Sequence, residues 1–572
     1  MTQFQLSLWT ALIVWAGFLD KAFLHTFFYR PICIGPLVGL LFGNLPMGLI
    51  AGVTIELMFL ATVFVGTVTP PDEVTSVALA TAFACISGNL WAGIAVAIPI
   101  GIAGQRLKQI RNNTAFEYTQ KKLEEAAARA SARGIVAWAT LVPTLIEGLF
   151  FAVPSFLLLY FAAAPLQSAF DHLPYEVLLG IAIGSSLVGA VGIASFLGTI
   201  KDRSAWPYFI IGFVAMAYFG IGIIGVALIA CAATALSLRS ERKGQQGEKR
   251  GPGSDPATDI HQAVTDCPQN TPVEDCITVS SQGATGDRDT NRSEGNSTST
   301  APTKKLTRRD LWKTFIYSLA IESGCSTSKQ EAPGFTQAMI PVIENVYDTK
   351  EEKAEAYTRH AQLFLTEGRV AQFIVGVVAK LEEQRAAMRD VEAEDILLYK
   401  SALAGPLAGI GDSLLHGTLR PLMAGIACVL VYAGGFQNLL GPVLFFLVMT
   451  GAVFAVRIIG FFKGYNEGMT AIERLQRSGI VERVTSHAAV ASYMLAGAFI
   501  PALLHFSLPA IPWRGDYFYL QNTLDLLVPG LIPLLYTFWM YRLLYKKNQS
   551  PVVLVVATLL LGIAVAYIGT AL

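Results

Sequence analysis

Long apolar stretches occupy both ends of the chain, and a polar section separates them. Each stretch is long enough to cross about 30 Å of hydrocarbon at roughly 20 residues per pass, or to enter it partway. In the first part they lie near residues 6–23, 32–66, 76–103, 134–163, 176–198 and 205–236. The last part begins amphipathic and becomes apolar again from about Leu397. This pattern predicts an all-α polytopic membrane protein with two transmembrane halves.

Composition divides the chain into three domains. Residues 1–238 form the first membrane domain, and residues 305–572 form the second. Residues 239–304 are rich in Ser, Thr, Gly, Asp and Asn, and they contain too little apolar surface to repay the entropy of folding. This section is predicted to be a disordered linker that spans some 45 Å, at about 5–6 Å × √n.

The second domain is predicted to start with cytoplasmic or interfacial amphipathic helices that continue to about residue 396. Thr307 and Asp310 form a T-x-x-D signal for the start of a helix. Apolar residues then recur at helical spacing on one face: Leu311, Phe315, Ile316 and Leu319. Such a helix lies in the membrane interface or packs on its own domain, and the pattern allows both.

Basic residues mark the side of the membrane on which the loops lie. Lys and Arg are in excess in 104–134, at the start of the linker, and in 463–486 and 541–547, whereas 164–175 has none. The positive-inside rule therefore places the basic loops and the linker in the cytoplasm. A single pass at 205–236 would leave the linker outside, so the glycines in the middle of that stretch favour a broken or hairpin element.

Composition and charge narrow the classes of function. The 572 residues are 53% hydrophobic and only 15% charged, against about a quarter charged in soluble proteins. Lys+Arg and Asp+Glu both number 42, so no basic footprint indicates nucleic acid. The seven cysteines include no CxxC pair, and no Walker-type, HExxH or GxSxG motif occurs. We therefore expect no metal site, no cofactor and no catalytic set of residues.

Polar residues interrupt the apolar pattern of the first half between Thr54 and Glu73. The paired prolines end one helix or begin the next, and Thr69 and Asp72 can cap the new helix. Glu56 stands in an otherwise apolar run, where a buried carboxylate needs a partner or a function. The predicted substrate-facing residues are Glu56, Phe59, Pro70, Pro71 and Asp72, with Thr69 in support.

A comparable interruption occurs in the second half, at Gly405–Ser413. Glycines, a proline and an Asp-Ser pair between apolar helices suggest a broken, re-entrant element. The predicted site residues here are Asp412 and Ser413, with His416, Thr418 and Arg420 in support. Interrupted segments in corresponding places of two halves indicate a transport site near the midplane.

These residue types suit a sugar, although structural roles remain open. Carboxylates accept hydrogen bonds from vicinal hydroxyl groups, free amides donate to ring oxygens, and Phe59 can cover the apolar face of a ring. Asp72 and Asp412 can instead simply cap helices. For His416 a structural hydrogen bond is favoured, and for Arg420 an aspartate or headgroup partner.

The two interrupted segments also carry a family resemblance. Residues 1–238 resemble component IIC, and residues 305–572 component IID, of the mannose/fructose/sorbose family of the bacterial phosphoenolpyruvate-dependent sugar phosphotransferase system. The first match includes Arg30-Pro31, Glu56-Leu57 and Pro70-Pro71-Asp72. The second includes Lys305-Leu306-Thr307, Arg359-His360 and the specific string GPLAGIGDSLLHGTLRP.

The resemblance implies a sugar permease in a bacterial cell membrane, made of usually separate components fused in one chain. It implies two halves with inverted pseudosymmetry, elevator movement and a homotrimer. It also implies phosphorylation by the partner IIB, which is supplied by IIA, so that this chain is not an enzyme by itself. The family's sugar-facing positions correspond to Glu56, Pro70, Pro71 and Asp72, with Asp412 and Ser413 nearby.

The sequence departs from the family pattern at three places. Asn44 stands where the family often has Asp. A tract similar to W-N-Y-E-R-M-Q reads Cys325–Glu331, and a phrase similar to F-F-N-T-x-P reads Leu363–Gly368. If those tracts shape the pocket, the sugar differs from mannose.

A rival hypothesis is an ion-coupled secondary transporter with inverted repeats. Glu56 and Asp412 would then titrate or bind a cation. Dependence on soluble phosphate carriers separates this hypothesis from a phosphotransferase permease.

Overall fold

The computed structural model describes most of both membrane domains. The described residues are 1–59, 71–199, 205–222, short stretches between 225 and 233, 305–388, 391–468, 480–504, 511–513, 516–518, 520–547 and 549–571. The predicted linker, 239–304, lies outside them, as do Thr69 and Pro70.

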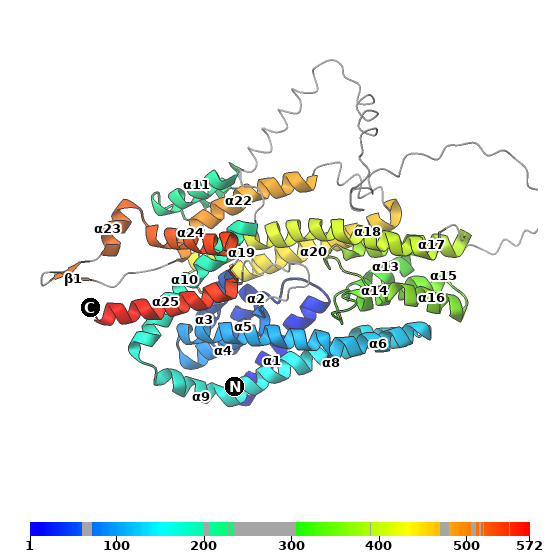
Figure 1. Ribbon diagram of the computed structural model, residues 1–572, viewed down its shortest axis with the longest axis horizontal. Coiled ribbons are helices and arrows are strands. Elements are labelled where there is room, and N and C mark those ends of the chain that lie inside the picture. Colours follow the sequence, from blue (N-terminus) through cyan, green and yellow to red (C-terminus); the bar gives the residue numbers. More distant parts are fainter. Residues whose placement is uncertain are drawn as a thin grey trace, which may run out of the picture. The chain divides into compact units, whose positions relative to one another are not determined.

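Helices account for nearly all of the described structure, as predicted (Figure 1). The helices of the first half are α1 (Gln3–Ala22), α2 (Pro31–Leu41), α3 (Leu45–Met58), α4 (Glu73–Ser87), α5 (Leu90–Asn113), α6 (Ala115–Ala128), α7 (Ala132–Val136), α8 (Val142–Glu147), α9 (Val153–Asp171), α10 (Tyr175–Thr199) and α11 (Trp206–Ala217). Two π-helical turns, Ala137–Leu141 and Gly148–Ala152, join α7, α8 and α9 into one continuous helix.

The second half follows the same all-helical plan, apart from one small hairpin. Its helices are α13 (Arg308–Ser318), α14 (Ala332–Ala338), α15 (Ile340–Val346), α16 (Lys350–His360), α17 (Ala371–Met388), α18 (Ala393–Gly411), α19 (Arg420–Ala433), α20 (Leu440–Glu467), α22 (Ile480–Leu503), α23 (Leu520–Leu527), α24 (Leu531–Lys546) and α25 (Pro551–Ala571). Strands β1 (Ile511–Trp513) and β2 (Asp516–Phe518) pair antiparallel, with Pro512 opposite Tyr517.

Five helices in the described residues are long and apolar enough to cross a membrane, or six if a bent pair counts as one span. They are Leu90–Ala128, Ala132–Asp171, Tyr175–Ser195, Ala393–Ala433 and Leu440–Glu467, and the bent pair is Gln521–Leu527 with Leu531–Lys546, at 84°. The chain is therefore a multi-pass membrane protein.

The described part of the apolar stretch 32–66, which ends at residue 59, contains two short helices, α2 and α3. Helices α2 and α3 pack closely because glycines meet glycines across their interface. A Cβ added to Gly35 would lie 2.6 Å from Cα of Gly52, and one added to Gly39 would lie 2.6 Å from Cα of Gly48. Asn44 caps α3 by accepting a hydrogen bond from the N–H of Met47, at 3.1 Å. Asn and Asp cap helices equally well, so this departure from the family pattern conserves the cap.

The predicted break at Gly405–Ser413 is wrong in the second half. Helix α18 continues through a π-helical segment, Asp412–Leu419, into α19, and the whole forms one helix, Ala393–Ala433. The wider π turns keep the backbone hydrogen-bonded where a re-entrant loop was expected. Two other expectations are met: α13 starts at a capping box formed by Thr307 and Asp310, and Asp72 caps α4. Helix α13 packs on α14, α15 and α17 of its own domain.

The two halves share one buried core. The largest apolar cluster joins Phe18, Phe27 and Val74 of the first half to Phe445 and Phe499 of the second. A second cluster joins residues of α6 to α13–α17. Side chains from chain segments more than 300 residues apart therefore belong to one buried apolar cluster.

Candidate functional site

Glu56, near the end of α3, forms a buried ion pair with Arg30 at the start of α2. Its side chain is fully buried and accepts a hydrogen bond from Nε of Arg30 at 3.0 Å. The other carboxylate oxygen accepts from the N–H of Ile32 at 3.3 Å. Arg30 also donates to the backbone carbonyl oxygen of Phe59 at 3.2 Å, so it holds the end of α3. The predicted residues Glu56 and Phe59 are thus adjacent, but both are engaged by Arg30.

Asp72 is paired as well. One oxygen accepts from the N–H of Thr75 at 2.9 Å as the helix cap, and the other lies 2.7 Å from Nζ of Lys108. Its neighbour Glu73 forms an ion pair with Lys21 at 2.6 Å. A Cβ added to Gly104 would lie 2.6 Å from the Asp72 Cβ, so α5 packs directly against this residue. Pro71 is half-buried beside it.

The second-half candidates lie along the π-helical segment. The Ser413 hydroxyl donates to the carbonyl of Ile410 at 3.1 Å, within its own helix. His416 is buried, with Nε2 2.7 Å from a guanidinium nitrogen of Arg369 and Nδ1 3.4 Å from one of Arg420. Thr418 is half-buried. Asp412 is half-buried, and its side chain makes no hydrogen bond or ion pair with the described residues.

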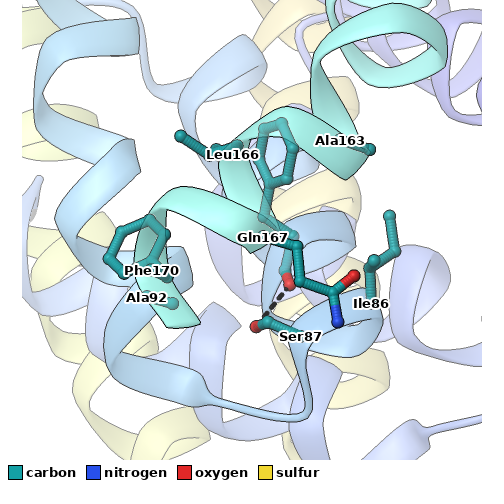
Figure 2. A pocket seen from close by; sticks show the side chains of 8 residues that line it. Ile86, Ser87, Ala92, Ala163, Leu166, Gln167 and Phe170 are labelled. Carbon is teal, nitrogen blue, oxygen red and sulfur yellow. Dashed lines mark hydrogen bonds between the residues drawn. The ribbon is translucent and has the colours of Figure 1, made fainter. Parts of the chain in front are cut away.

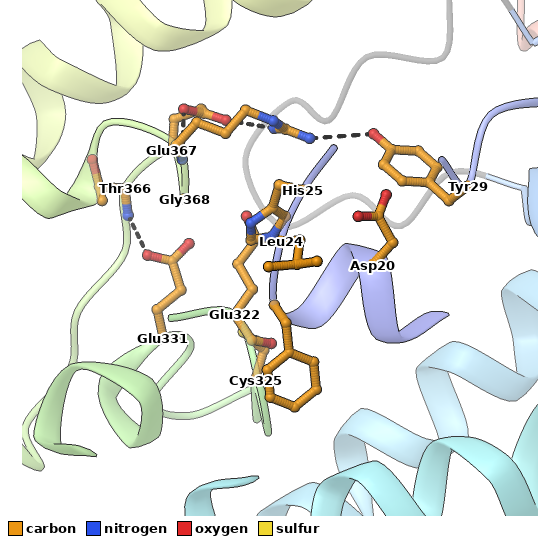
Figure 3. Close-up of polar contacts among 12 residues, drawn as sticks. Asp20, Leu24, His25, Tyr29, Glu322, Cys325, Glu331, Thr366, Glu367 and Gly368 are labelled. Carbon is orange, nitrogen blue, oxygen red and sulfur yellow. Dashed lines mark hydrogen bonds and ion pairs between the residues drawn. The ribbon is translucent and has the colours of Figure 1, made fainter. Parts of the chain in front are cut away.

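His416 and Asp412 belong to a larger polar cluster that the sequence analysis missed. We call it the inter-half cluster, because loops and helices of both halves build it (Figure 3). It consists of Asp20, His25, Tyr29, Glu322, Glu331, Glu367, Arg369, Asp412, His416 and Arg457. In the sequence, the cluster is indicated only by the tract Thr366-Glu367-Gly368-Arg369 and by single charged residues in apolar surroundings.

Direct contacts hold the two halves together in the inter-half cluster. Nε2 of His25 lies 3.0 Å from a carboxylate oxygen of Glu322. Arg369 forms an ion pair with Glu367 at 2.6 Å and donates to the Tyr29 hydroxyl at 3.3 Å. Arg457 reaches the loop after α1, where it donates to the carbonyl of Leu24 at 2.9 Å.

The loop after α1 is held in an unusual conformation. His25 and Phe27 have positive φ angles of 53° and 62°, and residues other than glycine rarely adopt this backbone conformation. Strained backbone of this kind is often found at ligand sites, where surrounding contacts enforce it. Here Arg457 binds the carbonyls of the loop, and the guanidinium group of Arg369 lies 4.4 Å from the centre of the Phe27 ring.

The two tracts that depart from the family pattern lie side by side in the inter-half cluster. The N–H of Glu331 donates to the carbonyl of Phe364 at 2.9 Å, and the N–H of Thr366 donates to the Glu331 carboxylate at 3.1 Å. A Cβ on Gly368 would lie 2.1 Å from a carboxylate oxygen of Glu322. A side chain at this position would therefore displace the Glu322 carboxylate from its place beside the loop.

Charge around Glu331 is one-sided. The side chain is 6% exposed and has no cationic partner among the described residues. Burial, together with the carboxylates of Glu322, Glu367 and Asp412, holds the pKa of Glu331 well above its usual range. Glu367 is shifted in the opposite direction. Burial alone would raise the pKa of Glu367, but the guanidinium group of Arg369 holds that pKa below its usual range.

Two pockets lie elsewhere. A pocket between α4, α5 and α9 is lined by Phe83, Ile86, Ser87, Ala92, Ala163, Leu166, Gln167 and Phe170 (Figure 2). Its cavity volume of about 10 Å³ is roughly that of one water molecule, too small for a sugar. A polar cavity of about 320 Å³ lies over α15–α17 and is lined by Val346, Tyr347, Asp348, Glu352, Glu355, Arg359, Arg385 and Ala386. In the part of the chain that the structure describes, no group of three His, Cys, Asp or Glu residues is arranged to hold a metal ion.

Comparisons with known proteins match both halves. Residues 4–236 match the family described as the sorbose-specific IIC component of the phosphotransferase system (PTS). Residues 305–571 match the family described as the PTS mannose/fructose/sorbose family IID component.

Individual relatives match one half each. The PTS mannose-specific EIID component of Escherichia coli K12 is 33% identical over 277 residues, which are 47% of this chain and 96% of that protein. The PTS sorbose-specific EIIC component of Lacticaseibacillus casei is 24% identical over 219 residues, 38% of this chain and 77% of that protein. A solved complex of the mannose transporter ManYZ with microcin E492 contains a chain 32% identical over 46% of this chain and 96% of its own length, with a TM-score of 0.28.

Proposed function

The chain belongs to the mannose/fructose/sorbose family of phosphotransferase-system membrane components, with a IIC and a IID component in one polypeptide, and from that premise we propose how it moves its substrate. It is a sugar permease. We propose that it carries a hexose-type sugar inward across a bacterial cytoplasmic membrane, where a separate IIB component, supplied with phosphate by IIA, phosphorylates it. The chain itself then performs no phosphoryl transfer.

The observation that carries this proposal is the match of both halves to the two membrane components of one transport system. The shared core supports it, because the described parts of the IIC-like and IID-like halves pack as one compact unit. Within that unit the inter-half cluster brings hydrogen-bonding groups of both halves to one place, as a sugar with several hydroxyl groups requires.

We assign the sugar to the inter-half cluster. Asp412 projects from the π-helical segment and has no hydrogen-bond or ion-pair partner among the described residues. His416, Arg369 and Tyr29 provide further groups that can donate or accept hydrogen bonds. In this proposal Glu56 and Asp72 position the α2–α3 hairpin and α4, and they face the sugar only if their ion pairs open. Pro71 and Ser413, both half-buried, contribute to the shape of the site in this proposal.

The remaining features are proposals drawn from the family. The linker and basic loops lie in the cytoplasm, on the side from which IIB approaches. The assembly is a homotrimer, and one module moves against the other as an elevator between pseudosymmetric halves.

The test uses membrane vesicles that contain the full chain, with soluble IIA and IIB, the general phosphocarriers and phosphoenolpyruvate. We expect sugar phosphate to accumulate from at least one hexose, and none to form when IIB is left out. Uptake of free sugar without the carriers, stopped by a protonophore, would instead establish the ion-coupled rival. Vesicles with Asp412→Asn should lose the product, whereas Glu351→Gln, which removes an exposed carboxylate of α16, should not.

A further inference from the structure

Helix α13 has two faces of different character. Leu311 and Phe315 are buried and pack on the helix's own domain. On the other face Trp312 is 39% exposed and Ile316 is 59% exposed, although both side chains are large and apolar. Because these two residues are four positions apart, they are neighbours on the helix surface. An apolar stripe is therefore left uncovered by the described residues.

Cations surround this stripe, and no exposed acid on α13 opposes them. Asp310, the only acidic residue of the helix, is buried and engaged with Thr307 in the helix cap. The exposed basic residues are Lys305, Arg308, Arg309 and Lys313, with Lys463 at the adjoining end of α20. None of these five side chains forms a hydrogen bond or an ion pair with a described residue. We call the five cations, together with Trp312 and Ile316, the α13 patch.

Contacts at its two ends fix the direction of α13. The N–H of Leu306, just before the helix, donates to a carboxylate oxygen of Glu383 at 2.8 Å. At the other end, the side chain of Gln372 donates to the carbonyl of Ser318 at 3.0 Å. Helix α13 therefore runs antiparallel to α17, which lies beside it (Figure 1). Glu383 also accepts from the Tyr465 hydroxyl at 2.9 Å, so α13 begins near the polar end of α20.

Farther along, α13 reaches the apolar part of α20, a candidate membrane span. The Trp312 and Phe462 rings meet edge to face, with their centroids 5.1 Å apart. Phe462 ends the apolar sequence of that span, and Lys463 follows it. Along α13 the cations thus come first, then Trp312, and Ile316 lies nearest the apolar part of the span. A membrane surface presents the same order, from charged headgroups through the interface that Trp prefers to hydrocarbon.

We propose that the α13 patch binds anionic phospholipid headgroups at the membrane surface, with Trp312 in the interface and Ile316 below it. Lipid phosphates supply the negative charge that the five cations lack, and acyl chains cover the apolar stripe. An apolar stripe flanked by Lys and Arg is typical of helices that bind anionic membranes. A soluble phosphate would satisfy the cations but leave Trp312 and Ile316 in water. The inference does not depend on the proposed permease function.

The experiment measures lipid binding at Trp312 in the full chain. Nanodiscs of phosphatidylcholine contain a small, varied fraction of a lipid brominated in its acyl chains, either phosphatidylglycerol or phosphatidylcholine. Bromine quenches tryptophan fluorescence on contact, and the part of the quenching that Trp312→Phe removes reports this position alone. Each Lys or Arg near an anionic surface should strengthen association about fivefold. We therefore expect brominated phosphatidylglycerol to bind at Trp312 at least about fivefold more tightly than brominated phosphatidylcholine.

Matched variants test the role of the cations. Arg308→Gln/Arg309→Gln/Lys313→Gln should reduce the preference for phosphatidylglycerol below about twofold. Lys121→Gln/Lys122→Gln/Arg129→Gln removes the same number of cations from α6, where Glu125 pairs with two of them, and should leave the preference unchanged. High salt should weaken the preference of the unchanged protein, because it screens exposed charges. Thermal unfolding of each variant checks that the fold is retained.

Equal affinity of the two lipids at Trp312, or a preference that the α13 triple variant retains, would overturn the inference. Absence of quenching by both lipids would show that another occupant covers the patch, either residues 239–304 or a second copy of the chain, and would also overturn it. If the triple variant fails to fold, the single variants Arg309→Gln and Lys313→Gln replace it. Each should lower the preference several-fold, and no change in either would count against the proposal.

Discussion

Several buried carboxylates of the first half are paired with a cation, whereas two carboxylates of the inter-half cluster are not. In the first half Glu56, Asp72, Glu73 and Glu147 each lie within ion-pair distance of an arginine or lysine. In the inter-half cluster Glu331 and Asp412 have no such cation among the described residues, whereas Glu367 is paired with Arg369. Away from this cluster, Glu382 and Glu383 of the second half are paired with Arg359 and Lys380.

The presence or absence of a cationic partner distinguishes two roles of a buried carboxylate in a membrane protein: fixing the structure and binding a ligand. A buried pair satisfies its own charges and fixes the helices that carry it, but losing one partner leaves an uncompensated charge. A carboxylate without a cation destabilises the empty site and gains energy when a suitable ligand arrives. The first-half pairs are therefore positioning groups, and the unpaired second-half carboxylates are the candidates for substrate contact.

The largest expected effect comes from breaking the Arg30–Glu56 pair. Arg30→Met leaves the fully buried Glu56 carboxylate without its cation, which should lower the free energy of unfolding by about 3–5 kcal/mol. Thermal unfolding in detergent measures the loss. The double variant Arg30→Met/Glu56→Leu should recover most of it, and no recovery would mean that the pair does more than compensate charge.

Asp412 and Asp72 should respond oppositely to removal of their charge. Asp412→Asn is expected to lower uptake at least about tenfold with little change in stability, because Asp412 has no partner among the residues that the structure describes. Asp72→Asn removes the partner of Lys108 and weakens a helix cap, which should cost about 1–3 kcal/mol. Uptake and unfolding are measured on both variants. Normal uptake by Asp412→Asn would return that residue to a structural role.

Two glycines of α18 give a smaller and more local comparison. A Cβ on Gly411 would lie 2.8 Å from a carboxylate oxygen of Glu367, whereas one on Gly409 meets nothing within 4 Å. Gly411→Ala should displace Glu367 from Arg369 and lower uptake several-fold. Gly409→Ala should leave uptake unchanged and slightly stabilise the helix, by up to about 1 kcal/mol. Equal uptake by both variants would argue against a role for Glu367.

A third cluster, formed by Arg359, His360 and Glu382 in α16 and α17, is closed like those of the first half. Burial lowers the pKa of His360 to about 4, against about 6.5 when unfolded. The unfolded chain therefore binds the extra proton first, so stability should fall as pH drops from about 6.5 to 4. The free energy of unfolding, measured over this pH range, should depend less steeply on pH in His360→Gln than in the unchanged protein. An unchanged pH dependence would mean that another group takes up the proton.

The smallest effect is expected from cutting the chain within residues 239–304. The halves share an apolar core and several buried polar contacts, which do not depend on covalent continuity. Co-expressed halves should therefore assemble and retain uptake. Halves that insert well but stay inactive would show that the linker does more than connect them.

Local patterns predicted local structure well. The helix starts at Thr307 and Asp72 could be predicted from the sequence, because capping depends on residues only three positions apart. The same reasoning failed at Gly405–Ser413, where glycine and proline were read as a break. A π-helical segment keeps that helix continuous, and the wider turn is decided by packing around it rather than by residue type.

The sequence by itself determined that this protein is a helical membrane protein with two halves, and it carried the resemblance to IIC and IID components. Hydropathy, capping and motif spacing depend on residues within a few positions of one another or within a single helix, so they can be predicted from the sequence. Only the tertiary structure decided which carboxylates are paired and which are open, because an ion pair forms within about 4 Å through space. His25 and Glu322 meet across almost 300 residues of chain, and Arg457 reaches Leu24 across more than 400. No periodicity in the sequence records such a distance.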